Sequence, residues 1–191
     1  SRVLGEAGIP HPRTAHLTAP SSRVPFDPPV VVKPRFGSWG RDVTLCEDAA
    51  ALRRHLAQIV HRRWFKTHGA LVQELVPPQG EDVRLVVAGG TVVGAIRRIA
   101  APGEWRTNVA LGATRHPTTP TPETCELAIA AARSIEADLV GVDLLPSPDG
   151  GYVVIELNGA VEFNEQYALD DGDVYERTMT ALLGDRIAAV A

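Results

Sequence analysis

Three oxygen-bearing side chains near the end of the sequence, Asp143, Glu156 and Asn158, are of the types that bind a hard metal ion. They lie on two apolar segments, 141–145 and 152–158, which are separated by the residues Pro-Ser-Pro-Asp-Gly-Gly. Such a cluster is a strong turn signal, so the two segments are predicted to form a β-hairpin. If the hairpin is symmetrical about the middle of the turn, Asp143 lies directly opposite Glu156, which shares one face of its strand with Asn158.

The predicted pairing of two carboxylates has two interpretations. Opposed carboxylates repel each other, and burying them beside apolar neighbours without a partner is unfavourable. A divalent cation removes both problems, and Mg²⁺ prefers oxygen ligands while keeping positions for substrate phosphates. The alternative is an exposed acidic face on an edge hairpin, where water solvates each carboxylate.

A second candidate site surrounds Lys33, which follows three consecutive valines and so projects from the end of a predicted buried strand. The loop that follows, residues 35–41, contains Ser38, Trp39 and Gly40, and its backbone N–H groups could fold over phosphates. This loop lacks the Gly-Lys-Ser/Thr ending of a P-loop. The alternative is an ordinary turn between a strand and a helix.

A third candidate region could recognise a nucleoside. The residues Gln73, Glu74, Leu75 and Val76 end a predicted strand before two prolines, and exposed backbone at a strand end can hydrogen-bond a purine edge. Asp82, predicted to lie in the following loop, could accept a hydrogen bond from a ribose hydroxyl. An ordinary strand and loop is the alternative.

Cationic side chains gather in the central part of the sequence. Arg84, Arg97, Arg98 and Arg106, with Asn108, lie on predicted strands or in the loop after them. Arginine binds phosphate and carboxylate groups through two parallel hydrogen bonds, so the cluster is typical of a site for anions. Because side chains alternate along a strand, we expect at most one of Arg97 and Arg98 in the site. The alternative is a solvated sheet face.

The elements that position these residues are a mixture of helices and strands. Hydrophobic periodicity and turn residues predict helices at about 1–8, 47–66, 122–137 and 174–183, and strands at about 30–33, 70–76, 83–88, 91–99, 141–145 and 152–158. Residues 10–29 are predicted to be an irregular linker, and residues 101–120 a loop. The order lacks the regular alternation of a parallel sheet, so we expect an α+β fold with mainly antiparallel sheets.

Composition and charge are ordinary for a globular protein. The 191 residues are 45% hydrophobic and 22% charged, and the formal net charge of −4 argues against a dedicated nucleic-acid binder. The two cysteines, Cys46 and Cys125, match no metal or redox spacing and indicate a reducing compartment. No apolar run reaches membrane-spanning length and no signal pattern is recognisable, so a cytoplasmic location is predicted. The start at Ser1, inside a predicted helix, suggests a trimmed or processed chain.

Five motifs, in order along the chain, resemble those of the ATP-grasp superfamily and of its RimK-type amino-acid ligases. They are Val-Val-Lys-Pro with Gly-Ser-Trp-Gly-Arg (31–41), Val-Gln-Glu-Leu-Val with Glu-Asp-Val-Arg (72–84), Ala-Ile-Arg-Arg with Arg-Thr-Asn (95–108), Gly-Val-Asp-Leu (141–144) and Glu-Leu-Asn (156–158). The loop of the first motif and residues 158–164 are most similar to the LysX-like branch. That branch contains ligases that join α-aminoadipate or glutamate to an amino-group carrier protein.

The resemblance implies an ATP-grasp fold in which two small α+β subdomains, residues 1–76 and 77–191, clasp ATP. It also implies a role for each candidate residue on the nucleotide side of the site. Lys33 would hold phosphates under a closing loop formed by Ser38, Trp39 and Gly40; adenine would contact Gln73, Glu74, Leu75 and Val76; and Asp82 would lie near the ribose.

On the side of the chemistry, the resemblance implies that Asp143, Glu156 and Asn158 bind Mg²⁺, with Mn²⁺ as an alternative. Arg98 would stabilise the oxygens of an acyl-phosphate. Arg106 and Asn108 would lie near the acceptor amino acid. The sequence departs from the branch at Leu111, where a cation is expected, and the family's N-terminal domain is expected to be absent.

The implied activity is that of an ADP-forming carboxylate–amine ligase. ATP would phosphorylate a carboxylate, and an amine would attack the acyl-phosphate to give an amide, attaching glutamate or an α-aminoadipate-like residue to a peptide or carrier protein. The alternatives are a RimK-type glutamate ligase, a peptide ligase of secondary metabolism, and a nucleotide- or carrier-binding module without turnover. An acidic carrier protein could dock on the basic face of the predicted helix 47–66. Assembly into a homo-oligomer is a further alternative.

Overall fold

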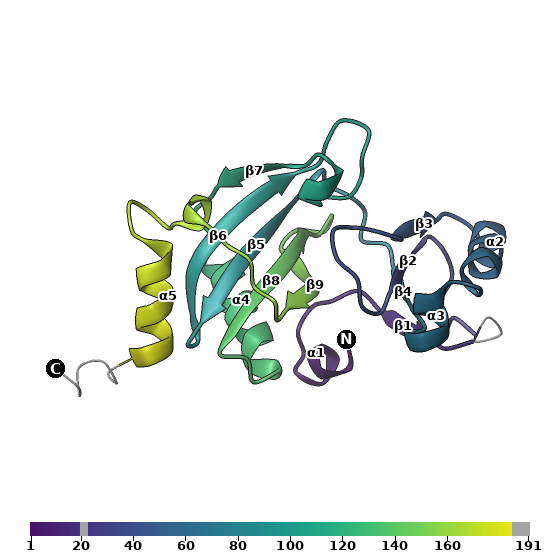
Figure 1. The fold of residues 1–191 in the computed structure, drawn as a ribbon, viewed down its shortest axis with the longest axis horizontal. Coiled ribbons are helices and arrows are strands. Elements are labelled where there is room, and N and C mark those ends of the chain that lie inside the picture. Colours follow the sequence, from purple (N-terminus) through teal and green to yellow (C-terminus); the bar gives the residue numbers. More distant parts are fainter. Residues whose placement is uncertain (20–22, 185–191) are drawn as a thin grey trace. The chain divides into compact units, whose positions relative to one another are not determined.

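The structure is a computed structural model in which residues 1–19 and 23–184 are described, and the chain forms two compact units. The first unit contains Ser1 and residues 12–77, and the second contains residues 2–11 and the chain from residue 78 onward (Figure 1). Each unit has one antiparallel sheet with helices, so the predicted α+β class is confirmed. The sequence predicted subdomains of residues 1–76 and 77–191. The observed units differ from these mainly in residues 2–11, which pack with the second unit and not with the first.

The first unit is a four-stranded sheet with two helices. Its strand order is β1-β4-β2-β3, and the helices α2 and α3 cover the apolar side chains of the central strands. Val30, Val32 and Val72 are fully buried against Leu52 and Leu56. The elements are β1 (Thr14–Leu17), β2 (Val30–Pro34), β3 (Thr44–Cys46), α2 (Ala49–Ile59), α3 (Arg63–His68) and β4 (Ala70–Glu74).

The predictions for this unit were wrong in two places. Strands β1 and β3 were missed; β1 lies in the Pro- and Ser-rich segment predicted to be irregular, and it pairs with β4. The single helix expected at 47–66 is divided, because Arg62 has extended backbone (φ −68°, ψ 137°). At 3.6 residues per turn, a continuous helix would place Phe65 opposite the face that carries Leu52 and Leu56. The break allows Phe65 to enter the core, where it is 3% exposed.

The second unit is a five-stranded antiparallel sheet with the order β7-β6-β5-β8-β9. Alternate side chains of the sheet enter two cores: α4 and α1 pack on one face, and η2 and α5 pack on the other. Strand β7 was missed in the predicted loop 101–120. The elements are α1 (Arg2–Glu6), β5 (Glu81–Ala88), β6 (Thr91–Ile99), η1 (Val109–Leu111), β7 (Thr114–Pro117), α4 (Pro122–Ser134), β8 (Leu139–Pro146), β9 (Tyr152–Asn158), η2 (Glu165–Tyr167) and α5 (Val174–Leu183).

Two features set the ends of helices α4 and α5. Thr121 is the N-cap of α4, where its side chain accepts a hydrogen bond from the N–H of Thr124 and Pro122 follows, as the sequence predicts. Asp173 caps α5 in the same way through the N–H groups of Tyr175 and Glu176.

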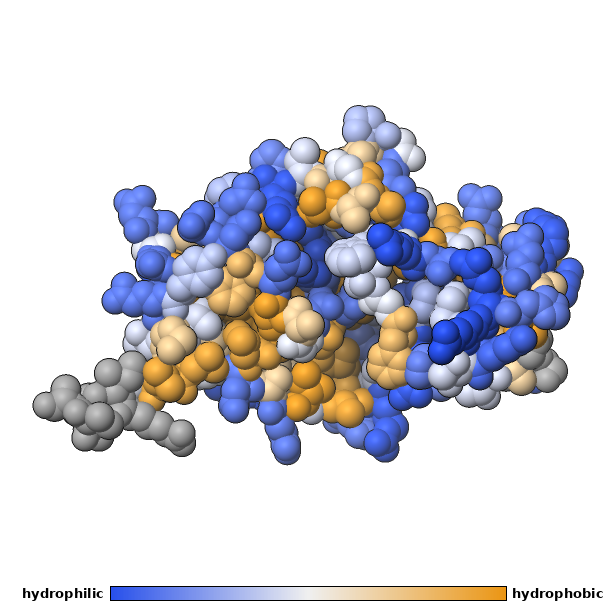
Figure 2. All heavy atoms as spheres, in the orientation of Figure 1, coloured by the Kyte–Doolittle hydropathy of each residue, from blue (hydrophilic) through white to orange (hydrophobic). Residues whose placement is uncertain are grey.

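The outer surface of α5 carries apolar side chains. Figure 2 shows apolar surface near the lower end of α5, and Met179 on this helix is 53% exposed. Within residues 1–19 and 23–184, none of the helices has the length and apolar character needed to cross a membrane.

Candidate active site

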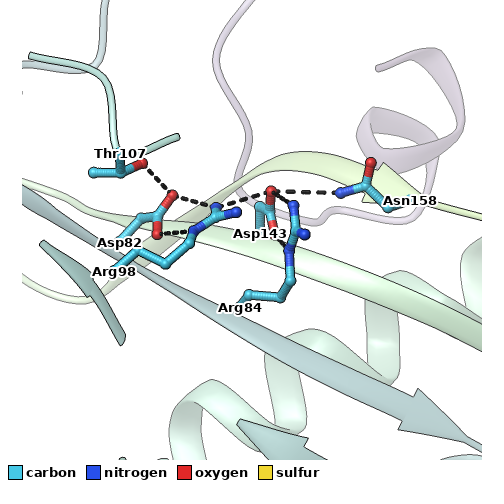
Figure 3. Close-up of polar contacts among 6 residues, drawn as sticks. All are labelled: Asp82, Arg84, Arg98, Thr107, Asp143 and Asn158. Carbon is cyan, nitrogen blue, oxygen red and sulfur yellow. Dashed lines mark hydrogen bonds and ion pairs between the residues drawn. The ribbon is translucent and has the colours of Figure 1, made fainter. Parts of the chain in front are cut away.

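Strand register in the second unit brings the candidate residues onto one face of the sheet. Asp82 on β5 pairs with Arg98 on β6, and Arg84 on β5 pairs with Asp143 on β8. Directly paired residues of an antiparallel ladder point to the same face. This face therefore carries two arginines and two carboxylates within three adjacent strands, as Figure 3 shows.

Arg84 holds Asp143 through two parallel hydrogen bonds. Its Nε donates to Asp143 Oδ1 at 2.6 Å and its Nη2 donates to Asp143 Oδ2 at 2.7 Å. Asp143 is 3% exposed, so burial raises the pKa of its carboxyl group, but the charges of Arg98 and Arg84 outweigh burial and hold that pKa below its ordinary value. Asp143 is therefore ionised at neutral pH.

Arg98 extends this arrangement to Asp82 and to the loop after β6. Arg98 Nε donates to Asp82 Oδ1 at 2.7 Å, and Nη2 donates to Asp82 Oδ2 at 2.5 Å. The same Nη2 lies 3.0 Å from Asp143 Oδ2. Thr107 Oγ1 donates to Asp82 Oδ2 at 2.5 Å, so a continuous chain of contacts runs from Thr107 to Arg84 (Figure 3).

The prediction that Asp82 lies in a loop was wrong. Asp82 is part of β5, is 2% exposed and has both carboxylate oxygens bound to Arg98. The position assigned to a ribose contact therefore serves, in this structure, to hold an arginine. Arg97 pairs with Val83 and faces the other side of the sheet, where it approaches Glu81 at 3.4 Å. Only Arg98 of the two neighbouring arginines lies in the site, as the strand alternation predicts.

The hairpin formed by β8 and β9 places Asp143 directly opposite Glu156, as predicted. The hairpin is not symmetrical throughout, because Leu144 pairs with Val154 and the register shifts by one residue between these two pairs. This bulge leaves Ile155 unpaired; without it, Ile155 would lie opposite Asp143. The bulge therefore determines that a carboxylate lies opposite Asp143.

Asn158 completes the predicted oxygen set. As drawn in Figure 3, Asn158 Nδ2 donates to Asp143 Oδ2 at 3.4 Å. With its amide turned over, Nδ2 donates to Glu156 Oε1 at 3.2 Å and Oδ1 accepts from Arg84 Nη2 at 3.1 Å. The second orientation satisfies both ends of the amide, so we adopt it.

In that orientation, an oxygen of Asp143 and the amide oxygen of Asn158 both accept hydrogen bonds from Nη2 of Arg84, which is positively charged. Oxygens that converge on one cation are chemically suited to Mg²⁺, which binds through one or two carboxylates and leaves positions for substrate phosphates. The donor set therefore fits the metal. Within residues 1–19 and 23–184, no group of three or more His, Cys, Asp or Glu side chains could hold a metal ion. The set proposed here has two carboxylates, and its third oxygen comes from an amide.

The loop after β6 contains Arg106 and Asn108. Arg106 is held by Glu104, which accepts from its Nε at 2.9 Å and from its Nη2 at 2.7 Å. Hydrogen bonds from Arg106 lower the pKa of the Glu104 carboxyl group to about 2. The backbone oxygen of Asn108 accepts from the N–H of Leu111 at 2.9 Å and begins η1.

The sequence analysis missed two residues of this loop, Thr107 and Glu104. Thr107 contacts Asp82, and Glu104 holds Arg106. Their neighbours, Arg106 and Asn108, were recognised by residue type. A threonine or a glutamate in a loop gives no comparable signal by itself.

In the first unit, Lys33 lies on β2 beside the glycine-containing loop, as predicted. Residues 35–39 of that loop are exposed, whereas Gly40 is buried. Trp39 is 55% exposed and has a left-handed backbone (φ 62°), and Gly40 has φ 69°. The N–H of Arg41 donates to the carbonyl of Ser38 at 3.3 Å, and the Arg41 guanidinium stacks over the Trp39 ring at 4.7 Å. An aromatic ring and a cation thus lie together at the surface of the loop.

The segment predicted to contact a purine is partly occupied by other contacts. The N–H of Glu74 donates to the carbonyl of Arg13, and the N–H of Leu75 donates to the carbonyl of Pro29. The Glu74 carboxylate binds Arg13, and the buried side chain of Gln73 donates to Thr14 Oγ1 at 2.9 Å. The expectation of exposed backbone was wrong at the N–H groups of Glu74 and Leu75. The unpredicted strand β1 brings Arg13 beside Glu74, and Pro29, just before β2, accepts from Leu75.

Comparison with known proteins places this arrangement in a family. A RimK-like ATP-grasp domain matches residues 3–173. Glutamate–LysW ligase ArgX of Sulfurisphaera tokodaii is 34% identical over 137 residues, which are 71% of this chain and 48% of the relative. α-Aminoadipate–LysW ligase LysX of the same organism is 32% identical over 148 residues, which are 78% of this chain and 52% of the relative.

Solved structures of ATP-grasp ligases have a similar fold. The ATP-grasp ligase PsnB, solved in complex with Mg, ADP and a phosphomimetic variant of its minimal precursor, superposes with a TM-score of 0.63 at 22% identity. The superposition covers 100% of this chain and 57% of PsnB, and this likeness concerns the fold. The chain spans about half the length of the curated relatives it matches. The resemblance drawn from the five sequence motifs is thus confirmed, and the chain belongs to the RimK-like ATP-grasp family.

Proposed function

We propose that this chain is the ATP- and metal-binding part of an ADP-forming carboxylate–amine ligase. The single observation that carries the proposal is the pair Asp143–Glu156 with Asn158 beside it, on the sheet of a RimK-like ATP-grasp domain. Asp143, Glu156 and Asn158 would hold Mg²⁺, with Mn²⁺ as an alternative. When bound, the metal neutralises the charge on the phosphates of ATP.

The side chains of this unit would do the remaining electrostatic work. Arg98 is held rigidly between Asp82 and Asp143, so it would present a fixed positive charge where an acyl-phosphate forms. Arg84 donates hydrogen bonds to the same oxygens that are proposed to bind the metal. When the metal binds, the Arg84 side chain would move away or bind these oxygens together with the metal. Arg106 and Asn108 would lie near the amine substrate.

In the first unit we assign Lys33 to the phosphates of ATP and the loop with Ser38, Trp39 and Gly40 to their coverage. The adenine would contact the segment from Glu74 to Val76. Gln73 would support that segment from the core through its bond to Thr14 rather than touch the nucleotide. Asp82 would act through Arg98 rather than on the ribose.

The substrates proposed are a carboxylate and an acidic amino acid. The curated relatives join glutamate or α-aminoadipate to LysW, a protein partner. We propose by analogy that the acceptor is a peptide or a carrier protein. The exposed cations of α2, α3 and their connection would form the surface on which an acidic acceptor docks. Because salt screens the attraction between opposite charges, it should weaken this docking. These cations are Arg53, Arg54, Arg62, Arg63 and Lys66.

The test is MgATP-dependent formation of hydroxamates from a panel of carboxylates in the presence of hydroxylamine. Asp143→Asn should reduce the signal by about tenfold or more, because it removes one of two charged metal ligands, and it should weaken Mg²⁺-dependent ATP binding in parallel. Glu81→Gln, on the other face of the sheet, is the matched control. Full activity of Asp143→Asn would refute the metal assignment.

A second candidate function is nucleotide binding without turnover. Binding of MgATP by the parent chain, lost in Asp143→Asn, without hydroxamate from any carboxylate would indicate this function.

A further inference from the structure

An arginine outside the set described above lies on the same face of the sheet. Arg115 is on β7, and its register partner on β6 is Arg98. Paired residues of an antiparallel ladder point to the same face, so Arg115 faces the side on which Arg98 meets its two carboxylates. Strand β7 was not predicted, and for that reason Arg115 was not recognised from the sequence.

The positive charge of Arg115 lies beside another positive charge, that of Arg98, and is not balanced by a carboxylate among the described residues. Like charges directly opposite each other on a sheet are destabilising, and Arg98 already uses Asp82 and Asp143. Ion pairs within residues 1–19 and 23–184 include no carboxylate partner for Arg115.

Its guanidinium group also has a donor without an acceptor. Arg115 is half-buried, and its Nε is shielded from solvent without a hydrogen-bond partner in the described part of the chain. A buried donor without an acceptor is unfavourable, and an arginine donor is best matched by a carboxylate or a phosphoryl oxygen. An anion at this place would satisfy the Nε and offset the repulsion between the two arginines.

Sheet geometry favours a carboxylate over a metal-bound phosphate. In the strand order β7-β6-β5-β8, Arg115 is separated from Asp143 by three strand spacings, roughly 14 Å. Phosphates bound to a metal at Asp143 would lie near that strand. The acyl-phosphate proposed at Arg98 would lie over β6, one strand short of β7, so a group bound by Arg115 belongs to the amino-acid substrate.

We propose that Arg115 binds the side-chain carboxylate of an acidic amino-acid substrate and so determines its specificity. This assignment rests on the proposed ligase function for the identity of the substrate, but the anion site itself follows from the positions of Arg98 and Arg115. It makes glutamate a better ligand than glutamine, its neutral analogue of nearly equal shape.

The experiment measures binding of L-glutamate, L-glutamine and inorganic phosphate to the whole chain by titration calorimetry. The parent should prefer glutamate to glutamine. Arg115→Gln should lower the affinity for glutamate by about tenfold or more, the loss expected for one charge-assisted hydrogen bond, and should leave glutamine binding unchanged. Arg115→Lys should retain part of the preference because it retains the charge.

Arg97→Gln is the matched control, because Arg97 is the neighbour of Arg98 on β6 but faces the other side of the sheet. Thermal unfolding of each variant separates lost binding from lost folding. The proposal is overturned if the parent does not prefer glutamate, if Arg115→Gln keeps the preference, or if Arg97→Gln loses it equally. A loss confined to phosphate also overturns the assignment to a carboxylate.

The two proposals fail separately. Hydroxamate formation that depends on Asp143 but not on Arg115, with unchanged glutamate preference, refutes the present inference and leaves the ligase function intact. Glutamate preference that depends on Arg115, in a chain that binds no MgATP, refutes the ligase function and leaves the anion site.

Discussion

Replacing Asp82 with asparagine tests whether the buried arginine–carboxylate chain stabilises the second unit. Asp82 is 2% exposed and Arg98 is 5% exposed, so the substitution would leave a buried guanidinium without its closest charged partner. Removing one member of a buried ion pair typically destabilises a protein by about 3–5 kcal/mol. Arg98 keeps a contact with Asp143 at 3.0 Å, so the loss should lie near the lower end, about 3 kcal/mol.

The same strand pair supplies the control. Glu81 and Arg97 approach each other at 3.4 Å on the opposite face, where their side chains are 32% and 44% exposed. Exposed ion pairs contribute at most about 1 kcal/mol, so Glu81→Gln should have a small effect. The difference of about 2 kcal/mol between the two variants measures the effect of burial, because both remove one carboxylate charge from β5.

Stability would be measured by guanidinium unfolding followed by circular dichroism and by hydrogen exchange. Because the chain has two units, a single transition cannot be assumed, and the exchange of β5 and β6 amides reports on the second unit alone. The midpoint should fall for Asp82→Asn while the slope with denaturant stays constant. Equal losses for Asp82→Asn and Glu81→Gln, or a loss below about 1 kcal/mol for Asp82→Asn, would refute the reasoning.

Two further predictions concern backbone packing and pH. A Cβ at Gly89 would lie 1.9 Å from the carbonyl oxygen of Ala181, whereas a Cβ at Gly90 meets no atom within 4 Å, and both glycines have positive φ. Gly89→Ala should therefore lower the unfolding temperature clearly more than Gly90→Ala in calorimetry, and equal effects would contradict the close packing of α5 on this turn. The Glu104 carboxyl group, whose pKa is lowered from 4.5 to about 2 by hydrogen bonds from Arg106, contributes stability that is complete above pH 4.5 and is lost as the pH falls through about 2. Carboxyl NMR titration should show this low pKa in the parent and a higher pKa in Arg106→Met, which loses the side-chain hydrogen bonds but keeps those from the N–H groups of residues 105 and 106; an ordinary pKa in the parent would argue against the contact.

Local sequence was sufficient for elements whose signals lie within a short stretch of chain. The bounds of β6 and α5 agree with those predicted, and the cap at Thr121 was identified from residue type and the proline that follows. The hairpin of β8 and β9 was also predicted, because its turn lies within the segment itself, but the pairing of Asp143 with Glu156 depends on the bulge at Ile155, which was not predicted. A hairpin brings near neighbours in sequence together, so its signal is local.

Short edge strands were not predictable in the same way. β1, β3 and β7 have three or four residues each, in segments with little apolar alternation. Such strands form because a longer neighbour offers unpaired backbone groups, and that neighbour is far away in the sequence for β1 and β4. For the same reason Arg115 was not recognised as part of the site.

The sequence by itself determined the family, because the five motifs are local properties of the chain, and it contains the residue types from which the proposed site is built. Tertiary structure alone decided which charges meet. The pairs Arg84–Asp143 and Asp82–Arg98 depend on the register of β5 with β8 and with β6, and the first of these pairs joins residues 59 positions apart. Register over such separations is fixed by the packing of two cores on the opposite faces of the sheet, which no single segment encodes.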